Sequence, residues 1–265
     1  MINQIFTAFL LSGLVAALAY WRGSLAASGA AAALLIGTII YGFGGWVWGV
    51  LLALFFISSS LLSHYKEKEK HAVAEKFDKG HRRDLGQVLA NGGAGAIVAL
   101  LYGYFPSPLW LPLFVGAIAT VTADTWATEL GTLSQRAPRL ITTGQIVPVG
   151  TSGGISLFGT AVSFVGGMLI GLAAGLLSQT NSVTLTIIGG LGGLVGSLGD
   201  SFLGATVQQI YTCDQCQKET EKKLHCGQPT LPLRGWAWMN NDMVNFLSSV
   251  FGGIITVLVY SLLVA

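Results

Sequence analysis

Charged residues are scarce in this chain of 265 residues. There are 14 Lys and Arg and 12 Asp and Glu, so 10% of the chain is charged, against about 25% in a soluble domain. This scarcity excludes an ordinary soluble domain, and the lack of a basic patch interleaved with aromatic residues argues against nucleic-acid binding. Hydrophobic residues make up 52% of the chain. They form continuous runs without a period of two, which excludes a transmembrane β-barrel and predicts an all-α, polytopic bundle of transmembrane helices.

Eight apolar runs are long enough to cross a bilayer as helices, which takes about 17 to 25 residues. The first run has no basic start, so we expect a membrane span there and not a cleavable signal peptide. Together the runs predict one integral membrane domain over residues 1–265. The predicted spans are Ile2–Tyr20, Ser24–Tyr41, Trp46–Ser63, Val88–Tyr104, Leu109–Gly131, Gly154–Leu177, Val183–Ile210 and Val244–Val264.

Positive charges are absent from every second connection between these spans. All 14 Lys and Arg fall in the odd-numbered connections, which share one side of the membrane. The positive-inside rule therefore predicts a plasma (inner) membrane protein with both termini outside and its long loops in the cytoplasm. The outer connections are very short, so we expect any active site to face the cytoplasm. The long loops are a basic loop at 64–87, a Gly- and Thr-rich loop at 132–153 and a Cys-containing loop at 211–240.

Three carboxylates lie inside the predicted spans. Asp124 and Glu129 belong to the fifth span and Asp200 to the seventh. An ionisable group at the centre of a transmembrane helix costs about 2.5–3.5 kcal/mol, which makes each one a candidate functional residue. We expect all three to be catalytic. The alternatives are that Asp200 belongs to a polar packing seam and that Glu129 lies in interfacial water. The closely spaced glycines of the seventh span are expected to serve helix packing.

Further polar side chains lie near the cytoplasmic ends of two other spans. Asn91 is near the start of the fourth span, and Asn241, Asp242 and Asn245 are at the start of the eighth; we expect them to bind substrate or its phosphates. Separate polar groups in hydrocarbon would each need a partner, whereas one hydrated pocket satisfies them together. We therefore predict that spans four, five, seven and eight enclose one cytoplasmic pocket, with the start of span six at its rim. The predicted Mg²⁺ ligands in this pocket are Asp124, Asp200 and Asp242.

A Gly- and Thr-rich stretch leads into the sixth span. A helix N-terminus that follows such a turn presents free N–H groups and the positive end of its dipole to an anion. Thr151 or Ser152 is the expected cap of this helix. An ordinary capped helix start is the alternative to phosphate binding, and the stretch contains no Walker motif. The predicted phosphate-binding residues here are Arg139, Thr142, Thr143, Gly150, Thr151, Ser152 and Gly153.

The chain has three Cys, all in the loop at 211–240. Structural disulfides are rare in the cytoplasm. Cys213 and Cys216, with the adjacent His225 and Cys226, provide a Cys₃His ligand set for Zn²⁺. Adjacent ligands are awkward, however, and the second Cys-x-x-Cys pair of a zinc ribbon is missing. Free cytoplasmic thiols are therefore the alternative.

The stretch from His64 to Arg83 mixes seven basic with four acidic residues. This pattern predicts a solvated amphipathic helix on an anionic membrane surface. A contact of Arg82 or Arg83 with nucleotide phosphates is the alternative.

Six motifs, in order from about residue 80 to the end, resemble one membrane family. That family includes transmembrane protein 19 and the plant phytyl-phosphate kinase. The resemblance implies a fold of packed transmembrane helices and, for the plant member, transfer of a phosphoryl group from a nucleoside triphosphate to phytyl phosphate. The matching motifs are Gln87-Val-Leu-Ala-Asn-Gly-Gly93, Ala123-Asp-Thr-Trp-Ala-Thr-Glu-Leu-Gly131, Pro138-Arg-Leu-Ile-Thr-Thr-Gly144, Gly153-Gly-Ile-Ser-Leu-Phe-Gly159, Gly196-Ser-Leu-Gly-Asp-Ser-Phe-Leu-Gly-Ala-Thr206 and Asn241-Asp-Met-Val-Asn245.

The residues and the resemblance together predict a Mg²⁺-dependent prenyl-phosphate kinase. Such an enzyme would transfer a phosphoryl group from CTP or another nucleoside triphosphate to an isoprenoid monophosphate held among membrane lipid. One alternative is a transporter of an anionic or amphipathic solute, because midplane carboxylates and Gly-broken helices also suit alternating access. The other is a cytidylyltransferase that forms a CDP-lipid and releases pyrophosphate.

Overall fold

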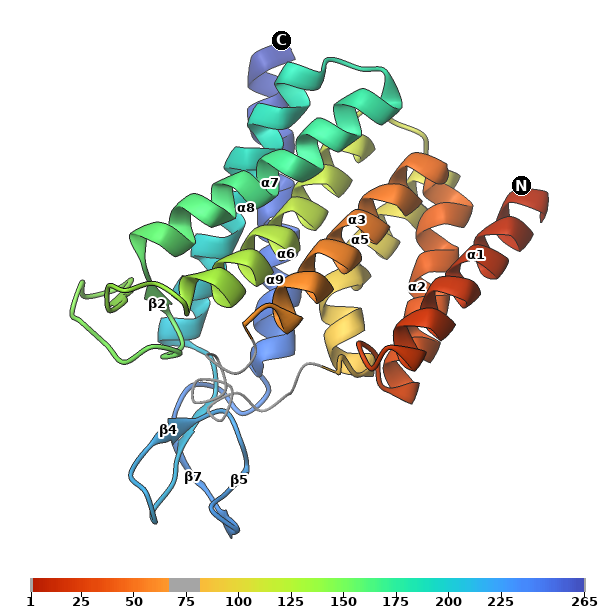
Figure 1. Ribbon diagram of the computed structural model, residues 1–265. Coiled ribbons are helices and arrows are strands. Elements are labelled where there is room, and N and C mark those ends of the chain that lie inside the picture. The colour runs from red at the N-terminus through yellow and green to blue at the C-terminus, as the bar shows by residue number, and fades with distance from the viewer. Residues whose placement is uncertain (1, 67–81, 265) are drawn as a thin grey trace.

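The structure, a computed structural model, describes residues 2–66 and 82–264. In these ranges the chain forms a bundle of eight long helices, as predicted. Figure 1 shows both termini at one end of the bundle and short strands at the opposite end, which we call the loop end and which carries residues 132–156 and 207–240. The helices are α1 (Ile2–Trp21), α2 (Ala27–Gly44), α3 (Trp46–His64), α5 (Leu85–Tyr104), α6 (Trp110–Gly131), α7 (Leu157–Ser178), α8 (Ser182–Thr206) and α9 (Asn241–Val264).

Helix α6 lies at the centre of the bundle. Every residue from Phe114 to Ala123 is buried, and α6 packs against α3, α5, α7, α8 and α9. By length and composition, the other seven described helices are apolar enough to cross a membrane. Helix α6 falls below that hydropathy because it carries several Thr and two carboxylates. Its enclosure by neighbouring helices, which keeps it away from lipid, explains how these polar residues are accommodated.

The loop end contains short antiparallel strands that the sequence did not predict. β1 (Arg139–Leu140) pairs with β2 (Gly154–Ile155), so the Gly- and Thr-rich loop closes on itself before α7. After α8, the chain forms a three-stranded sheet of order β4-β3-β7 and a separate β5-β6 hairpin. These strands are β3 (Ile210–Thr212), β4 (Glu219–Thr220), β5 (Leu224–His225), β6 (Gln228–Pro229) and β7 (Leu231–Arg234).

Several helix ends differ from the predictions. Ser156 caps α7, with its Oγ accepting a bond from Gly159 N at 3.0 Å, so the expected cap at Thr151 or Ser152 is wrong. The reason is the β1–β2 pair, which holds the preceding residues extended. Helix α8 ends at Thr206 and not at Ile210 as predicted, so Gln208 lies beyond the helix.

Helix α5 begins earlier than predicted, at Leu85. The Asp84 carboxylate accepts a bond from Gln87 N, and the Gln87 side chain accepts one from Asp84 N, which forms a capping box. Of the amphipathic helix predicted between His64 and Arg83, residues 67–81 lie outside the described ranges. Arg83 forms a backbone bridge with Leu25.

Close contacts between glycine and threonine fix the crossing of α6, α8 and α9. Thr120 Oγ1 on α6 donates to Gly192 O on α8 at 3.3 Å. A Cβ added at Gly192 would overlap Thr256 Oγ1 of α9, and a Cβ added at Gly252 of α9 would overlap Thr120 Oγ1. The three backbones can approach this closely only because these positions carry no side chain, which confirms the packing role expected of the α8 glycines.

We predict that Gly252→Ala destabilises the protein, because the new methyl group must displace Thr120. Overpacking of this kind costs about 1–3 kcal/mol. Gly13→Ala is the matched control, because its Cβ would meet only Leu34 at an ordinary 3.7 Å. In thermal unfolding of the detergent-purified protein, Gly252→Ala should lower the midpoint relative to Gly13→Ala. Equal midpoints would contradict the crossing described here.

Candidate functional site

A cavity of about 710 Å³ lies at the loop end. Its walls come from α5, α6, α8 and α9, with the start of α7 at one side, which is the pocket that the sequence predicted. Eleven of the predicted functional positions line it. They are Asn91, Asp124, Glu129, Gly150, Thr151, Ser152, Gly153, Asp200, Asn241, Asp242 and Asn245.

Asn91, Asp124 and Asp200 reach the cavity at a similar depth, and Ser248, which contacts Asp200, lies level with them. Asp124 lies seven residues before the end of α6 and Asp200 six before the end of α8, while Asn91 and Ser248 lie six and seven residues after the starts of α5 and α9. At about 1.5 Å of rise per residue, each is roughly 9–10 Å from the loop end of its helix. The predicted end of this span at Ile210 would place Asp200 deeper, at roughly 15 Å. The early end of α8 therefore brings Asp200 level with Asp124.

Each of these two carboxylates is held by a serine from a neighbouring helix. Ser197 Oγ of α8 donates to Asp124 Oδ1 at 3.3 Å, and Ser248 Oγ of α9 donates to Asp200 Oδ2 at 3.0 Å. The carboxylates are close enough to interact electrostatically. Both are half-buried and line the cavity. In the described residues, each accepts this one side-chain hydrogen bond, so its other oxygen is available to a ligand.

Arg83 also lines the cavity, although the sequence predicted a contact of this residue with phosphates only as the alternative to a solvated helix. It is buried, its Nη1 donates to Ser60 Oγ at 2.9 Å, and its guanidinium lies over the rings of Phe55 and Phe56. Burial lowers the pKa of Arg83 to about 10, and the nearby Glu129 carboxylate opposes this shift, so Arg83 stays charged at neutral pH. The Asp84–Gln87 capping box could have revealed this position, because it places Arg83 immediately before a membrane helix.

Glu129 faces a different part of the cavity from Asp124. Its Oε1 accepts a bond from Ser63 Oγ of α3 at 2.7 Å, and it lies near Arg83. This agrees with the helical rotation between positions 124 and 129, which separates the two side chains by more than a right angle. Glu129 therefore belongs to the Arg83 side of the cavity wall.

The Gly- and Thr-rich loop meets the cavity at Thr132 and Pro138 and then again at its end. Residues Gly150 to Gly153 line it, as do Ser156, Gly159 and Thr160 at the start of α7, so this helix N-terminus faces the cavity. The predicted phosphate ligands Arg139, Thr142 and Thr143 are exposed and are not part of the lining, and Arg139 Nη1 donates instead to Gly144 O at 2.8 Å. The structure thus corrects the expectation that these three residues share the site. The cause is the β1–β2 pairing, which turns residues 140–146 away.

A chain of hydrogen bonds connects three loop segments at the mouth of the cavity. Ser152 Oγ donates to Gln208 Oε1 at 2.7 Å, and Gln208 Nε2 donates to Glu221 Oε1 at 2.8 Å. Gln208 is only 2% exposed, so it acts as a buried connector. Next to Glu221, Lys222 and Lys223 also line the cavity. The sequence does not predict these residues, because nothing local in it indicates that the Cys-containing loop folds back over the membrane helices.

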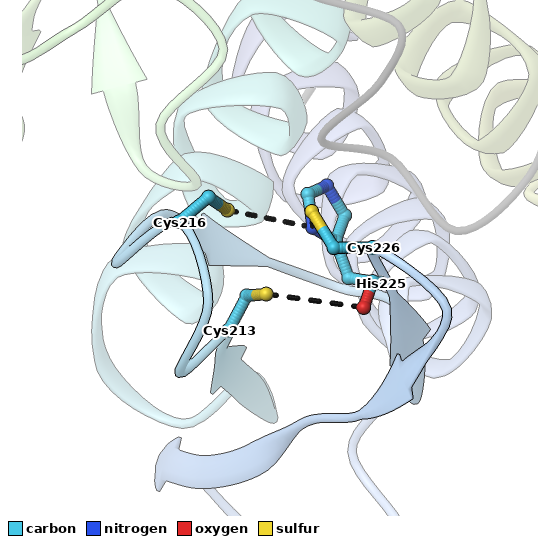
Figure 2. A group of neighbouring side chains, drawn as sticks. All are labelled: Cys213, Cys216, His225 and Cys226. Carbon is cyan, nitrogen blue, oxygen red and sulfur yellow. Dashed lines mark hydrogen bonds between the residues drawn. The ribbon is translucent and has the colours of Figure 1, made fainter.

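The three cysteines and His225 form a compact group in the loop that contributes Lys222 and Lys223 to the cavity (Figure 2). Cys213 comes from the end of β3, Cys216 from the following turn, and His225 and Cys226 from the β5–β6 hairpin. The pKa of the Cys213 thiol is lowered to about 6, chiefly because the Cys216 backbone N–H donates to its sulfur. The pKa of Cys226 is raised to about 11 by desolvation and by the neighbouring sulfurs.

The fold and the cavity define a polytopic helical membrane protein with an acidic polar site at one end of its bundle. The chain belongs to the family described as integral membrane protein DUF92, whose model matches residues 10–253. No solved structure matches it.

Three curated relatives illustrate the breadth of this family. Protein PGR of Arabidopsis thaliana is 33% identical over 94% of this chain and 93% of its own length. An uncharacterized membrane protein of Methanocaldococcus jannaschii is 35% identical over 85% of this chain and 82% of its own. The chloroplastic protein VTE6 of Arabidopsis thaliana is 31% identical over 88% of this chain and 65% of its own length.

We predict that Gln208→Leu loosens both loop segments that Gln208 connects, because the substitution keeps the volume but removes both hydrogen bonds. Amide hydrogen exchange should become faster in residues 150–153 and 219–224 together, while the helices keep their protection. Gln145→Leu, at an exposed position of the Gly- and Thr-rich loop, is the control and should change neither segment. A faster exchange in only one of the two segments would show that Gln208 does not couple them.

Proposed function

We propose that this protein is a Mg²⁺-dependent phosphotransferase of the membrane, a prenyl-phosphate kinase that uses CTP or another nucleoside triphosphate. The observation that carries the proposal is the convergence of Asp124, Asp200 and Asp242, from three different helices, on one cavity that also receives a helix N-terminus. The relationship to VTE6 and the resemblance to the plant phytyl-phosphate kinase point to the same chemistry.

The cavity offers two kinds of group that bind phosphates. Arg83, Lys222 and Lys223 supply positive charge from two sides of the lining, and the start of α7 with Gly150–Gly153 supplies backbone N–H groups. Phosphoryl transfer depends mainly on positioning and charge neutralisation, and both are provided by such a set. Arg83 in particular is fixed by Ser60 and the two Phe rings, so it is already oriented before a ligand arrives.

The carboxylates fit a hard divalent cation. Mg²⁺ prefers oxygen ligands and is usually held by one or two carboxylates together with substrate phosphates. Asp124 and Asp200, steadied by Ser197 and Ser248, would hold the ion, with Asp242 as a further ligand. When bound, the ion supplies charge neutralisation at the phosphates.

The position of the site suits an acceptor with a hydrocarbon chain. The cavity is polar and lies at one end of the helices, whose outer surfaces expose large apolar side chains such as Leu89, Ile97 and Phe251. An isoprenoid monophosphate would place its headgroup in the cavity and its chain along this apolar surface. In the reaction, an oxygen of the acceptor phosphate forms a bond to the γ-phosphorus, the bond from that phosphorus to the bridging oxygen breaks, and the nucleoside diphosphate leaves.

We also propose that the loop end faces the cytoplasm, where nucleotides are available. All 14 Lys and Arg belong to connections on that side in the predicted topology. Between the cavity and the end of the bundle that holds the termini, the helices are packed with fully buried side chains, among them Ile118 and Ile188. This packing favours an enzyme over the alternative of a transporter.

We predict that Asp124→Asn and Asp200→Asn each reduce turnover by about 100-fold or more, because each removes one charged ligand without changing the volume of the side chain. The assay combines purified protein, Mg²⁺, CTP or ATP, and farnesyl or geranylgeranyl phosphate, and it measures the prenyl diphosphate. Glu219→Gln is the control, since that exposed carboxylate lies outside the cavity and should leave turnover unchanged. Wild-type turnover in both Asp variants would refute this assignment.

The leaving group separates this proposal from the alternatives. A kinase releases the nucleoside diphosphate, whereas a cytidylyltransferase releases pyrophosphate and retains the nucleotide in the lipid product. Uptake of a solute into proteoliposomes without nucleotide consumption would instead indicate a transporter. Product analysis by mass spectrometry, together with a pyrophosphate assay, therefore decides among the three.

A further inference from the structure

The Cys-containing loop carries a second site, separate from the cavity. In it, the sulfur atoms of Cys213, Cys216 and Cys226 and a ring nitrogen of His225 all lie within 4.8 Å of one another. These are all three cysteines of the chain. Figure 2 shows the side chains of Cys213 and Cys216 on one segment facing those of His225 and Cys226 on another.

The spacing of these atoms matches a tetrahedral metal site. Bonds of about 2.3 Å to sulfur and about 2.0 Å to nitrogen place neighbouring ligand atoms roughly 3.5–3.8 Å apart. His225 Nδ1 lies 3.5 Å from Cys216 Sγ and 3.2 Å from Cys226 Sγ. A small inward adjustment of the side chains around one ion would therefore complete the site without moving the strands.

The backbone explains how two adjacent residues can both be ligands. Side chains of consecutive residues normally diverge, but Cys226 has a left-handed conformation with a φ of 52°, and Gly227 follows with a φ of 76°. This turn of the β5–β6 hairpin brings the Cys226 sulfur back to the same side as His225 Nδ1. On the facing segment, Gln217, directly after Cys216, also has a positive φ, of 57°. Left-handed non-glycine residues are uncommon, and here one is a member of the cluster and the other directly follows a member.

We propose that Cys213, Cys216, His225 and Cys226 bind one structural Zn²⁺ ion. The ligand set consists of three sulfurs and one imidazole, which is typical of closed structural zinc sites and unlike the oxygen ligands in the cavity. With four protein ligands, no coordination position is left for a substrate. This inference does not depend on the proposed transferase activity.

The zinc would order one wall of the cavity. The strands between Ile210 and Arg234 are two to four residues long, and few of their apolar side chains are buried, so they have little core of their own. Small units of this kind usually need a metal or disulfides to stay folded. Glu221, Lys222 and Lys223 lie between the two pairs of ligands, and all three line the cavity. The metal would thus fix the segment that Gln208 ties to Ser152.

The first test measures metal and thiols in the full-length protein purified in detergent. We expect one Zn²⁺ per chain by mass spectrometry of the metal content. All three thiols should resist Ellman's reagent until a strong chelator or a denaturant is added. Substitution with Co²⁺ should produce the charge-transfer and visible bands of a tetrahedral thiolate complex. Protein with no stoichiometric zinc and with immediately reactive thiols would overturn the proposal, and so would a Cys213–Cys216 disulfide.

The second test compares substitutions of the proposed zinc ligands with a substitution of a neighbouring residue that is not a ligand. Cys213→Ser and His225→Ala should each lose the zinc, whereas Asp214→Asn, at an exposed position between the first two ligands, should keep it. Should the ligand variants fail to fold, the wild-type protein treated with chelator provides the same comparison. In that sample, hydrogen exchange should become faster in residues 213–226 while the helices stay protected. Full zinc occupancy in Cys213→Ser, or unchanged exchange after removal of the metal, would refute the structural role.

Discussion

The close crossing of α6, α8 and α9 sets the positions of the carboxylates. Thr120 contacts both Gly192 and Gly252. The positions of the two carboxylates in the cavity follow from this contact. Asp124 follows Thr120 by one helical turn, and Asp200 follows Gly192 by about two turns. Both face the same space because the backbones cannot separate without losing the contact. A larger residue at the crossing would push the helices apart and separate the two carboxylates, so the glycines at the crossing and the carboxylates in the cavity depend on each other.

Much of the fold could be predicted because it follows from the solvent that a membrane provides. Long apolar runs must form helices in lipid. The placement of every Lys and Arg in alternate connections predicts how these helices are oriented across the bilayer. The shared pocket could also be predicted. Polar groups such as Asn91, Asp124 and Asp200 each cost free energy when they are buried separately in hydrocarbon, whereas one pocket can hydrate them together. The depth of Asp200 in the bundle could not be predicted from the neighbouring residues, because the end of α8 at Thr206 is set by the chain that follows.

The loops were predicted less well because their structure depends on contacts between distant residues. The β1–β2 pair joins Arg139 to Ile155 across 16 positions. Because of this pairing, the cap of α7 and the predicted phosphate ligands lie elsewhere than predicted. Gln208 connects Ser152 to Glu221 in a similar way. A hydrogen bond of this kind leaves no periodic pattern in the sequence. By contrast, the Asp84–Gln87 capping box is local and could have been recognised, and with it the position of Arg83.

The site therefore combines two parts with different physical requirements. The membrane helices supply the carboxylates, which lie in the bundle where they are held by Ser197 and Ser248. The loop end supplies most of the positive charge, because Lys222 and Lys223 belong to a segment outside the helices. Cations placed within the bundle would pair with Asp124 and Asp200 and leave them unavailable to a metal. Arg83 avoids this by lying on the Glu129 side of the cavity. Asp124 and Asp200 can thus share one cavity with Arg83, Lys222 and Lys223 without being paired with them, which is what the proposed binding of a cation and phosphates requires.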